Sequence, residues 1–271
     1  YNKRAGTAIV ITGAAARIAQ ETALLEHLQK TGWLKNICFI SGTSSGALNT
    51  VMLNAILNNR FSWERYHTIL FSLKNEDIFV RSGRSLPLNN MPYRELLTRI
   101  INDSLRYKCL GDMPLSCAIS ISDISAIPPH TRTYRLSNLK INTESNPDFN
   151  LVETLLASSA IPLIFPAARF NNPLGLPNSA FVDGGITDDH LPYEAVLEFE
   201  KYRNIGIDTL IIVSRKSDTQ SSIINFMPDS SNQDSRLSDK IEQKLENVAK
   251  NGFLRSMKTL QTEYPELAGR T

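Results

Sequence analysis

The sequence predicts a three-layer α/β/α sandwich built around a mostly parallel central sheet. Two consecutive strand–turn–helix segments open the 271-residue chain, which is the order of βαβ units, whose strands run parallel beneath crossover helices. The strand segments are short and continuously apolar, as is typical of strands buried on both faces. Hydrophobic residues make up 42% of the chain and charged residues 21%, which is enough apolar material for one large core.

The first unit spans residues 7–32. Residues 7–12 form an apolar, partly β-branched run that ends at Gly13, which predicts a buried strand followed by a turn. Over residues 17–30 apolar side chains recur every three or four positions, and Gly32 follows directly, as expected for a helix that ends in a glycine cap.

The second unit follows at once. Residues 37–40 predict another buried strand, residues 42–46 a sharp turn and residues 47–57 a helix. The same criteria predict further strands at 117–121, 133–136, 180–182 and 209–213, and further helices around 62–73, 92–105, 151–159 and 192–203.

We expect a single domain over residues 1–271, with its core over about residues 5–215. Residues 217–235 are rich in Ser, Asp, Asn and Gln and predict a polar loop. The spacing of apolar residues then predicts an amphipathic helix over about 236–264, interrupted near Gly252. Because one terminal helix seldom folds alone, its apolar face should pack on the core.

Composition excludes several classes of function. A net charge of +2, without any run of five or more Lys or Arg, argues against a nucleic-acid partner. Three cysteines, Cys38, Cys109 and Cys117, are odd in number and lack paired ligand spacing, so we expect no disulfide framework, no metal and no cofactor. No apolar run approaches the ~20 residues of a transmembrane helix.

The compartment is less closely defined. The start of the chain lacks the apolar segment of a signal peptide, and free cysteines favour the cytoplasm or export as an effector. The chain begins at Tyr1 rather than Met, which leaves a removed leader or a further domain open.

Residues 42–46, Gly-Thr-Ser-Ser-Gly, match the pattern G-x-S-x-G between a predicted strand and a predicted helix. Gly42 and Gly46 allow the strained turn that raises Ser44 above the sheet edge. The helix that follows directs free N–H groups and the positive end of its dipole to the same point, with the Ser45 N–H as one oxyanion donor. The alternative interpretation is a Ser/Gly-rich turn that only caps a helix.

A nucleophilic serine needs a base within hydrogen-bond reach. His27 and His67 lie in predicted amphipathic helices and His130 in a predicted loop, positions more typical of surface or packing residues. His190 is the one histidine near another motif, seven residues after Asp183. In a Ser–Asp–His triad the acid and the histidine normally come from separate loops, so this spacing is awkward.

The simpler hypothesis is that Asp183 itself accepts the proton of Ser44. Asp183 ends a predicted strand and is followed by Gly184 and Gly185, which let the backbone pass close to the serine. A carboxylate with a pKa of ~4 is a weak base, so the site must be dry enough to strengthen its attraction for the proton. The alternative is an ordinary Asp-Gly-Gly turn.

Four segments in fixed order resemble the patatin-like phospholipases. Residues 13–18, Gly-Ala-Ala-Ala-Arg-Ile, align with the glycine-rich loop G-G-G-x-R-G of that family, and residues 42–46 with its nucleophile turn. Residues 157–166, Ala-Ser-Ser-Ala-Ile-Pro-Leu-Ile-Phe-Pro, are similar to the block before the family's catalytic aspartate, and residues 183–185 to its Asp-Gly-Gly. The likeness spans residues 7 to about 215.

The resemblance implies a patatin-like fold and calcium-independent cleavage of fatty-acyl esters through an acyl-enzyme. The implied catalytic dyad is Ser44 with Asp183, without a histidine. The implied oxyanion hole consists of backbone N–H groups of Gly13, Ala14, Ala15 and Ser45, and the implied supporting residues are Arg17, Gly42, Gly46, Gly184 and Gly185.

The first loop departs from the family pattern, because Ala14, Ala15 and Ile18 stand where the family has glycine. If the loop uses positive φ at these positions, each alanine costs on the order of 1 kcal/mol and tilts the donors. Loss of one oxyanion donor lowers the rate roughly a hundred- to a thousandfold. The sequence is therefore compatible with an oxyanion hole that is intact, re-formed by other donors or impaired.

Three functions stay open, led by a lipid acyl-hydrolase of phospholipase A or lysophospholipase type. The others are an acyltransferase or thioesterase, whose relatives usually carry His where this chain has Thr43, and a catalytically impaired lipid- or protein-binding module. The substrate class suggests peripheral membrane contact. The candidate segments are residues 170–177, with Leu174 and Leu176, and residues 86–88 with Met91.

Overall fold

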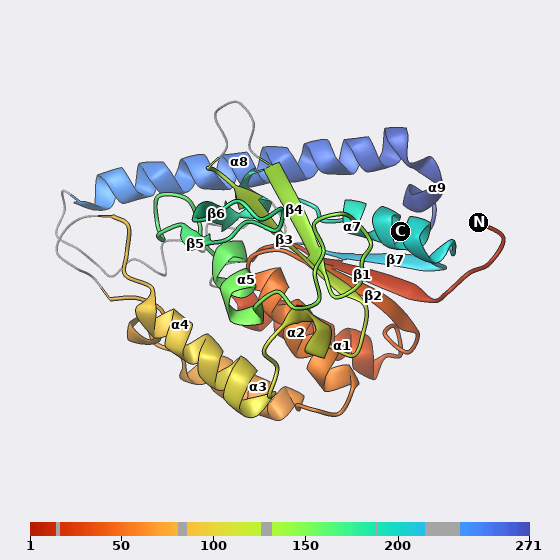
Figure 1. Ribbon diagram of the computed structural model, residues 1–271, viewed down its shortest axis with the longest axis horizontal. Helices are drawn as coiled ribbons and strands as arrows, with labels where there is room; N and C mark the ends of the chain where they lie inside the picture. Colours follow the sequence, from red (N-terminus) through yellow and green to blue (C-terminus); the bar gives the residue numbers. More distant parts are fainter. Residues whose placement is uncertain (15–16, 81–85, 126–131, 188, 215–233) are drawn as a thin grey trace.

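A computed structural model describes residues 1–14, 17–80, 86–125, 132–187, 189–214 and 234–271. Within these parts the strands form one seven-stranded sheet in the order β5-β6-β3-β2-β1-β7, with β4 paired to β3 (Figure 1). The strands are β1 (Thr7–Ile11), β2 (Ile37–Gly42), β3 (Cys117–Asp123), β4 (Arg132–Ser137), β5 (Ala168–Phe170), β6 (Ser179–Asp183) and β7 (Thr209–Val213).

The adjacent strands β7, β1, β2 and β3 run parallel, while β4 and β6 pair antiparallel with β3, and β5 antiparallel with β6. The helices are α1 (Ile18–Lys30), α2 (Ser45–Leu57), α3 (Trp63–Ser72), α4 (Met91–Leu97), α5 (Leu151–Ser158), α6 (Gly184–Thr187), α7 (Glu194–Arg203), α8 (Asp234–Glu263) and α9 (Pro265–Ala268). α4 continues into one π-helical segment over Thr98–Ser104.

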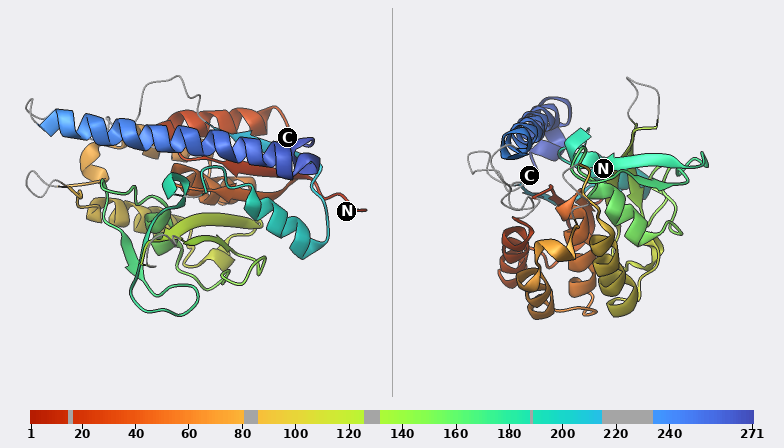
Figure 2. Two further views of the ribbon diagram at one scale, coloured as in Figure 1. Left: turned by 90° about the horizontal axis from the view of Figure 1, so that it is seen from above. Right: turned by 90° about the vertical axis from the view of Figure 1, so that its left-hand side faces the viewer.

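Two helical layers cover the two faces of the sheet (Figures 1 and 2). Along β1, Ile9 and Ile11 pack into the cluster that contains α1 to α5, whereas Ala8 and Val10 pack into the cluster that contains α7, α8 and α9. Alternation of side chains along a strand explains this division, because successive residues point to opposite faces. The three-layer sandwich with a mostly parallel sheet is confirmed.

Strands β2 and β6 meet end to end along one edge of β3. The parallel strand β2 stops with Gly42 opposite Ile119, and the antiparallel strand β6 arrives with Asp183 opposite Ile121. β4 occupies the other edge of β3 throughout this stretch. The carboxyl ends of β2 and β6 therefore face each other, two residues apart on the same neighbour.

The predicted elements occur within a few residues of their expected ends. The structure adds the short elements β5, α6 and α9, which the sequence does not predict. The predicted interruption near Gly252 is wrong, because α8 runs continuously through it. A buried position against the ring of His190 explains the glycine: a Cβ there would lie 2.2 Å from ring atom Cδ2. Most of the predicted polar loop, 217–235, lies outside the described residues.

Candidate active site

Ser44 lies in the turn between β2 and α2 with φ 57° and ψ −126°, a conformation that L-residues rarely adopt. The flanking glycines make this turn possible. A Cβ on Gly42 would lie 2.2 Å from the carbonyl oxygen of Gly46, and a Cβ on Gly46 would lie 2.2 Å from that of Ile11. A side chain at position 42 would collide with the first turns of α2, and one at position 46 would push the turn away from β1.

Asp183 is the last residue of β6 and is 1% exposed. Its Oδ1 accepts a hydrogen bond from the N–H of Gly185 at 2.8 Å. Its Oδ2 is buried and has no hydrogen-bond partner of normal geometry among the described residues. Because β2 and β6 end against each other, this carboxylate lies beside the nucleophile turn, and one of its oxygens is free to accept a proton.

The environment of Asp183 strengthens it as a base. Burial raises the pKa of its carboxyl to about 6, although the hydroxyl of Ser44 and the N–H groups of Gly185 and Ile186 act in the opposite direction. Desolvation disfavours the charged carboxylate and so increases its affinity for a proton.

A buried hydroxyl that the sequence did not single out joins three elements behind Ser44. The Oγ of Ser158, at the end of α5, accepts a hydrogen bond from the N–H of Ser44 at 2.9 Å. The same hydroxyl donates to the carbonyl oxygen of Ser120 in β3 at 2.8 Å. Ser158 lies in residues 157–166, the segment that resembles the family block before the aspartate. The sequence by itself assigns this serine no role of its own.

The first loop lies against the nucleophile turn. A Cβ on Gly13 would lie 3.0 Å from the Cβ of Ser44, so glycine permits this close approach. The N–H of Ala14 donates to the side-chain Oγ of Ser45 at 2.6 Å. Ala15 lies outside the described residues. Arg17 precedes α1 and donates its N–H to the carbonyl oxygen of Ala14.

The segment after Asp183 is held by a second set of contacts. Gly184 lies against Ser120, and its carbonyl oxygen accepts the N–H of Asp189. The Asp189 carboxylate accepts from the Ser120 hydroxyl at 2.5 Å and forms a 3.2 Å ion pair with Arg135. Arg135 also pairs with Glu194 of α7 at 2.8 Å. The Asp-Gly-Gly segment is thus fixed to β3, β4 and α7.

An apolar cavity of about 230 Å³ begins at Ser44 and Ser45 and extends between α1, α2, α3 and α4. Its polar wall near the serine includes Tyr93 and Ser159, whose oxygens lie 3.3 Å apart. Lys74 is the one charged residue among the described lining residues. The apolar lining includes Ile18, Leu48, Leu70, Leu97, Ile161 and Phe165.

The histidines lie elsewhere or serve other contacts. His67 hydrogen-bonds Glu26 at 2.5 Å, His27 lies in the last turn of α1, and His130 is outside the described residues. His190 is buried with its ring against Gly252 of α8. It is not among the groups that mainly set the pKa of Asp183.

Comparison with known proteins identifies the family of the chain. A family profile described as "Patatin-like phospholipase" matches residues 9–197, which is more than half of the chain and includes both Ser44 and Asp183. The chain belongs to the patatin-like phospholipase family. The predicted family is confirmed. A comparison with curated proteins gives no match.

Three solved structures are similar to the chain at low sequence identity. VipD from Legionella pneumophila is 14% identical, with a TM-score of 0.45 over 69% of this chain and 46% of its own. The type III effector ExoU is 12% identical, with a TM-score of 0.37, and the match covers 92% of this chain and 54% of ExoU. The heterodimeric ExoU–SpcU complex from the Pseudomonas aeruginosa type III secretion system is 14% identical, with a TM-score of 0.39, and the match covers 92% of this chain and 52% of that chain. The chain spans about half the length of these solved proteins.

The described residues contain no cluster of three or more His, Cys, Asp or Glu arranged to hold a metal ion. None of their helices combines the length and the apolar character needed to cross a bilayer.

Proposed function

We propose that the chain is a lipid acyl-hydrolase of phospholipase A or lysophospholipase type, with Ser44 as nucleophile and Asp183 as general base. The observation that carries the proposal is a strained serine that lines an apolar cavity, at the end of a strand that faces the strand ending in the buried Asp183. The cavity suits a fatty-acyl chain, since it is lined mainly by aliphatic side chains. The ester carbonyl would then lie at Ser44.

The proposed reaction has two steps. Asp183 takes the proton of the Ser44 hydroxyl as Oγ attacks the ester carbonyl, and it returns this proton to the departing alcohol as the tetrahedral intermediate collapses to an acyl-enzyme. Asp183 then takes a proton from water, which attacks the acyl-enzyme. The fatty acid leaves as Ser44 recovers its proton.

Backbone N–H groups are proposed to stabilise the negative oxygen of both intermediates. Gly13 borders Ser44, and Ser45 begins α2, whose first N–H groups have no acceptor within the helix. The dipole of the thirteen-residue helix α2 favours negative charge at the same place. Ala14 and Ala15 stay proposed donors, with the Ala14 N–H bound to Ser45 in the resting structure.

Lys74 favours a phospholipid over a neutral lipid. Its side chain is exposed at the edge of the cavity, where an ammonium group would attract the phosphate of a lipid head group. Such an exposed attraction is modest and screened by salt. We therefore expect Lys74→Gln to raise KM for a lysophospholipid at low salt and to leave hydrolysis of an uncharged ester unchanged.

Hydrolysis assays on matched variants test the proposal. We expect the wild type to cleave a chromogenic medium-chain ester and a lysophospholipid, and Ser44→Ala and Asp183→Asn each to lose at least about a thousandfold in kcat. Circular dichroism checks that both variants are folded. Wild-type turnover that survives Ser44→Ala would contradict the assignment of the nucleophile.

The hydrogen bond from Ala14 to Ser45 keeps a second candidate function open, a lipid- or protein-binding module with an impaired oxyanion hole. If this bond withholds a donor, Ser45→Ala should release the Ala14 N–H and raise kcat. If the wild type and Ser45→Ala are both inert toward esters and phospholipids, the binding module becomes the better explanation.

A further inference from the structure

Three segments near the cavity form one hydrogen-bonded unit. Val80 and Asn89 exchange backbone hydrogen bonds of 2.8 and 3.1 Å, and the N–H of Leu88 donates to the carbonyl oxygen of Ile164 at 2.8 Å. The N–H of Met91 donates to the side chain of Asn89 at 3.0 Å. Segments 78–80 and 86–91 are thereby joined to the distant segment 161–165, and together they form one wall.

The inner side of this wall is apolar and buried. Phe79, Leu88, Ile164 and Phe165 pack in one cluster, which Leu245 of α8 joins from the other side. Residues of the same three segments, or directly after them, also line the cavity: Ile78, Tyr93, Ile161 and Phe165. The wall therefore separates the proposed acyl site from solvent.

The outer side of the wall is also apolar, although it faces water. Val80 is 50% exposed, Met91 49%, Leu163 63% and Leu86 37%. We name these four side chains the outer patch. Each of Val80, Met91 and Leu163 is two residues from a side chain that lines the cavity. The outer patch and the cavity are thus two sides of the same short segments.

Leu163 is the strongest sign that this exposure serves a function. It has φ 71°, a left-handed conformation that is unfavourable for a branched side chain. The neighbouring Ile164 and Phe165 are buried, whereas Leu163 is exposed. The strained backbone at Leu163 therefore holds a large apolar side chain in water. The positive φ and the exposure are each unfavourable, and a partner that covers the side chain would remove the second cost.

We infer that the outer patch inserts into the surface of a lipid bilayer and so brings the cavity to its substrate. This inference rests on the proposed function. An acyl chain that leaves a membrane and crosses water loses favourable burial with every methylene group, so a site that works on membrane lipids gains from a continuous apolar path. Contact between bilayer and wall provides that path at the wall itself.

Vesicle binding tests the inference without requiring turnover. The Ser44→Ala variant would be sedimented with phosphatidylcholine vesicles at low and at high salt, alone and with Leu163→Asp plus Met91→Asp. We expect binding that persists at high salt, because insertion of apolar side chains is not screened. The double substitution should lower the partition coefficient by at least about tenfold, the effect of losing one buried leucine.

Two further variants separate binding from folding and from general hydrophobicity. Leu163→Gly removes the side chain and tolerates positive φ, so it should lose binding while the melting temperature stays level or rises. Trp33→Asp is the matched control. Trp33 is 61% exposed but lies before β2, at the amino-terminal edge of the parallel strands, opposite the cavity. It should leave binding unchanged.

The outcomes are distinguishable from those of the hydrolysis assays. If the parent does not bind these vesicles, or if the double variant binds as well as the parent, the inference is overturned and the outer patch is better assigned to a protein partner. If binding behaves as expected but the otherwise wild-type chain hydrolyses no lipid, the proposed function fails while the membrane surface stands. If Leu163→Asp plus Met91→Asp in the otherwise wild-type chain abolishes hydrolysis of vesicle lipids but leaves hydrolysis of a soluble ester intact, both the proposed function and the membrane surface are supported.

Discussion

At the scale of single residues, the site concentrates features that are unfavourable in isolation. Ser44 has positive φ, which costs on the order of 1–3 kcal/mol. Asp183 is buried with one carboxylate oxygen unpartnered among the described residues. Such costs persist only where the surroundings impose them, and here Gly42, Gly46 and Gly185 supply the space. The chemistry of the proposed dyad follows from this imposed proximity.

The pH dependence of hydrolysis is expected to follow Asp183. Only the carboxylate form is a base, and burial raises the pKa of this carboxyl to about 6. We therefore expect kcat/KM to fall about tenfold per pH unit below pH 6 and to level off above it. A pH profile on a soluble, non-ionising ester measures this. A half-maximal rate near pH 4 would instead indicate a hydrated aspartate.

Glu21 carries a second buried carboxyl, which is outside the proposed chemistry. Its Oε1 accepts from the side chain of Asn49 at 2.6 Å, and burial raises its pKa from 4.5 to about 8. The folded state keeps a proton that the unfolded state releases above pH 4.5. Stability should therefore decline as the pH rises from about 4.5 to 8.

Glu21→Gln should remove this decline, because a neutral amide retains the acceptor oxygen. We expect the variant and the wild type to be similarly stable near pH 4, and the variant to be more stable by on the order of a few kcal/mol at pH 8. Urea unfolding at the two pH values measures the difference. Glu95→Gln, at an exposed position on α4, is the control and should show no such pH-dependent gain.

At the scale of elements, two strands and one helix bring the dyad together. β2 and β6 share an edge of β3 and end against each other, which unites residues 44 and 183. The end of α5 then secures the nucleophile turn, since the Ser158 hydroxyl bonds both Ser44 and Ser120. The serine is thus positioned by a helix that follows it by more than a hundred residues.

Ser158→Ala should show that this contact positions the nucleophile. It leaves the buried N–H of Ser44 without its acceptor, a loss of about 1–3 kcal/mol. We expect kcat to fall roughly ten- to a hundredfold with little change in KM, in steady-state assays on a soluble ester. Ser159→Ala is the neighbouring control: its hydroxyl contacts Tyr93 in the cavity wall, so KM should respond more than kcat.

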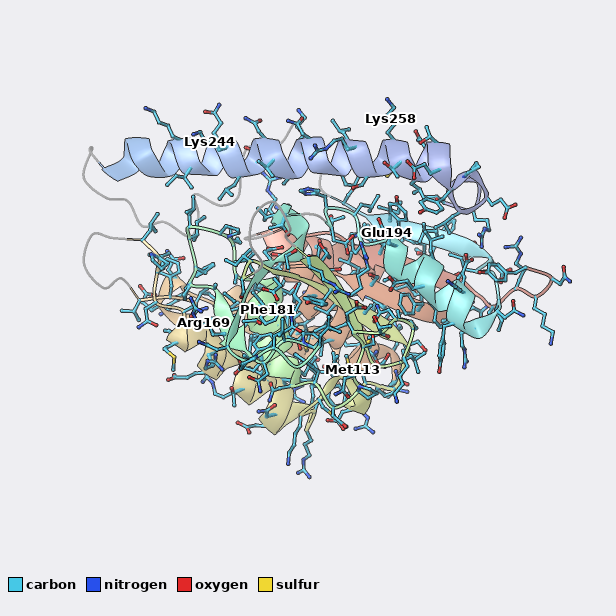
Figure 3. The ribbon with its side chains drawn as sticks, turned by 45° about the horizontal axis from the view of Figure 1, so that its top comes forward. Met113, Arg169, Phe181, Glu194, Lys244 and Lys258 are labelled. Carbon is cyan, nitrogen blue, oxygen red and sulfur yellow. The ribbon has the colours of Figure 1, made fainter. Side chains whose placement is uncertain are left out.

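At the scale of the whole molecule, α8 contacts both the wall of the cavity and the segment that follows Asp183. Figure 3 shows Lys244 and Lys258 projecting from its outer side, away from the body. Its inner side packs Leu245 against the wall of the cavity and Leu260 against the core under α7. Gly252 receives the ring of His190, which follows the Asp-Gly-Gly segment. The long helix therefore supports the segment that carries Asp183.

Because Gly252 packs on His190, the effect of Gly252→Ala on the free energy of unfolding should change sign when His190 is replaced. Gly252→Ala places a Cβ within 2.3 Å of the imidazole ring, so it should destabilise the wild type by about 1–3 kcal/mol. In a His190→Ala background the space is free, and the better helix propensity of alanine should stabilise the protein by about 1 kcal/mol. Denaturant unfolding of the wild type, the two single variants and the double variant measures both effects. The same sign in both backgrounds would contradict this packing.

The sequence by itself determined the parallel α/β core, because buried strands and amphipathic helices leave periodic patterns that local interactions alone explain. The G-x-S-x-G turn was predictable for the same reason: Gly42, Ser44 and Gly46 are neighbours in the chain. Asp183 was identified through its motif, but not through any local signal of proximity to Ser44.

Only the tertiary structure determined the features that arise where segments distant in sequence come into contact. The end-to-end approach of β2 and β6, the bridge through Ser158 and the burial that raises the pKa of Asp183 all join residues that no sequence window contains. Gly252 was interpreted as an interruption because its partner, His190, lies far away in sequence. Local propensity determines which elements form, whereas packing determines which side chains face one another, and the proposed chemistry depends on the second.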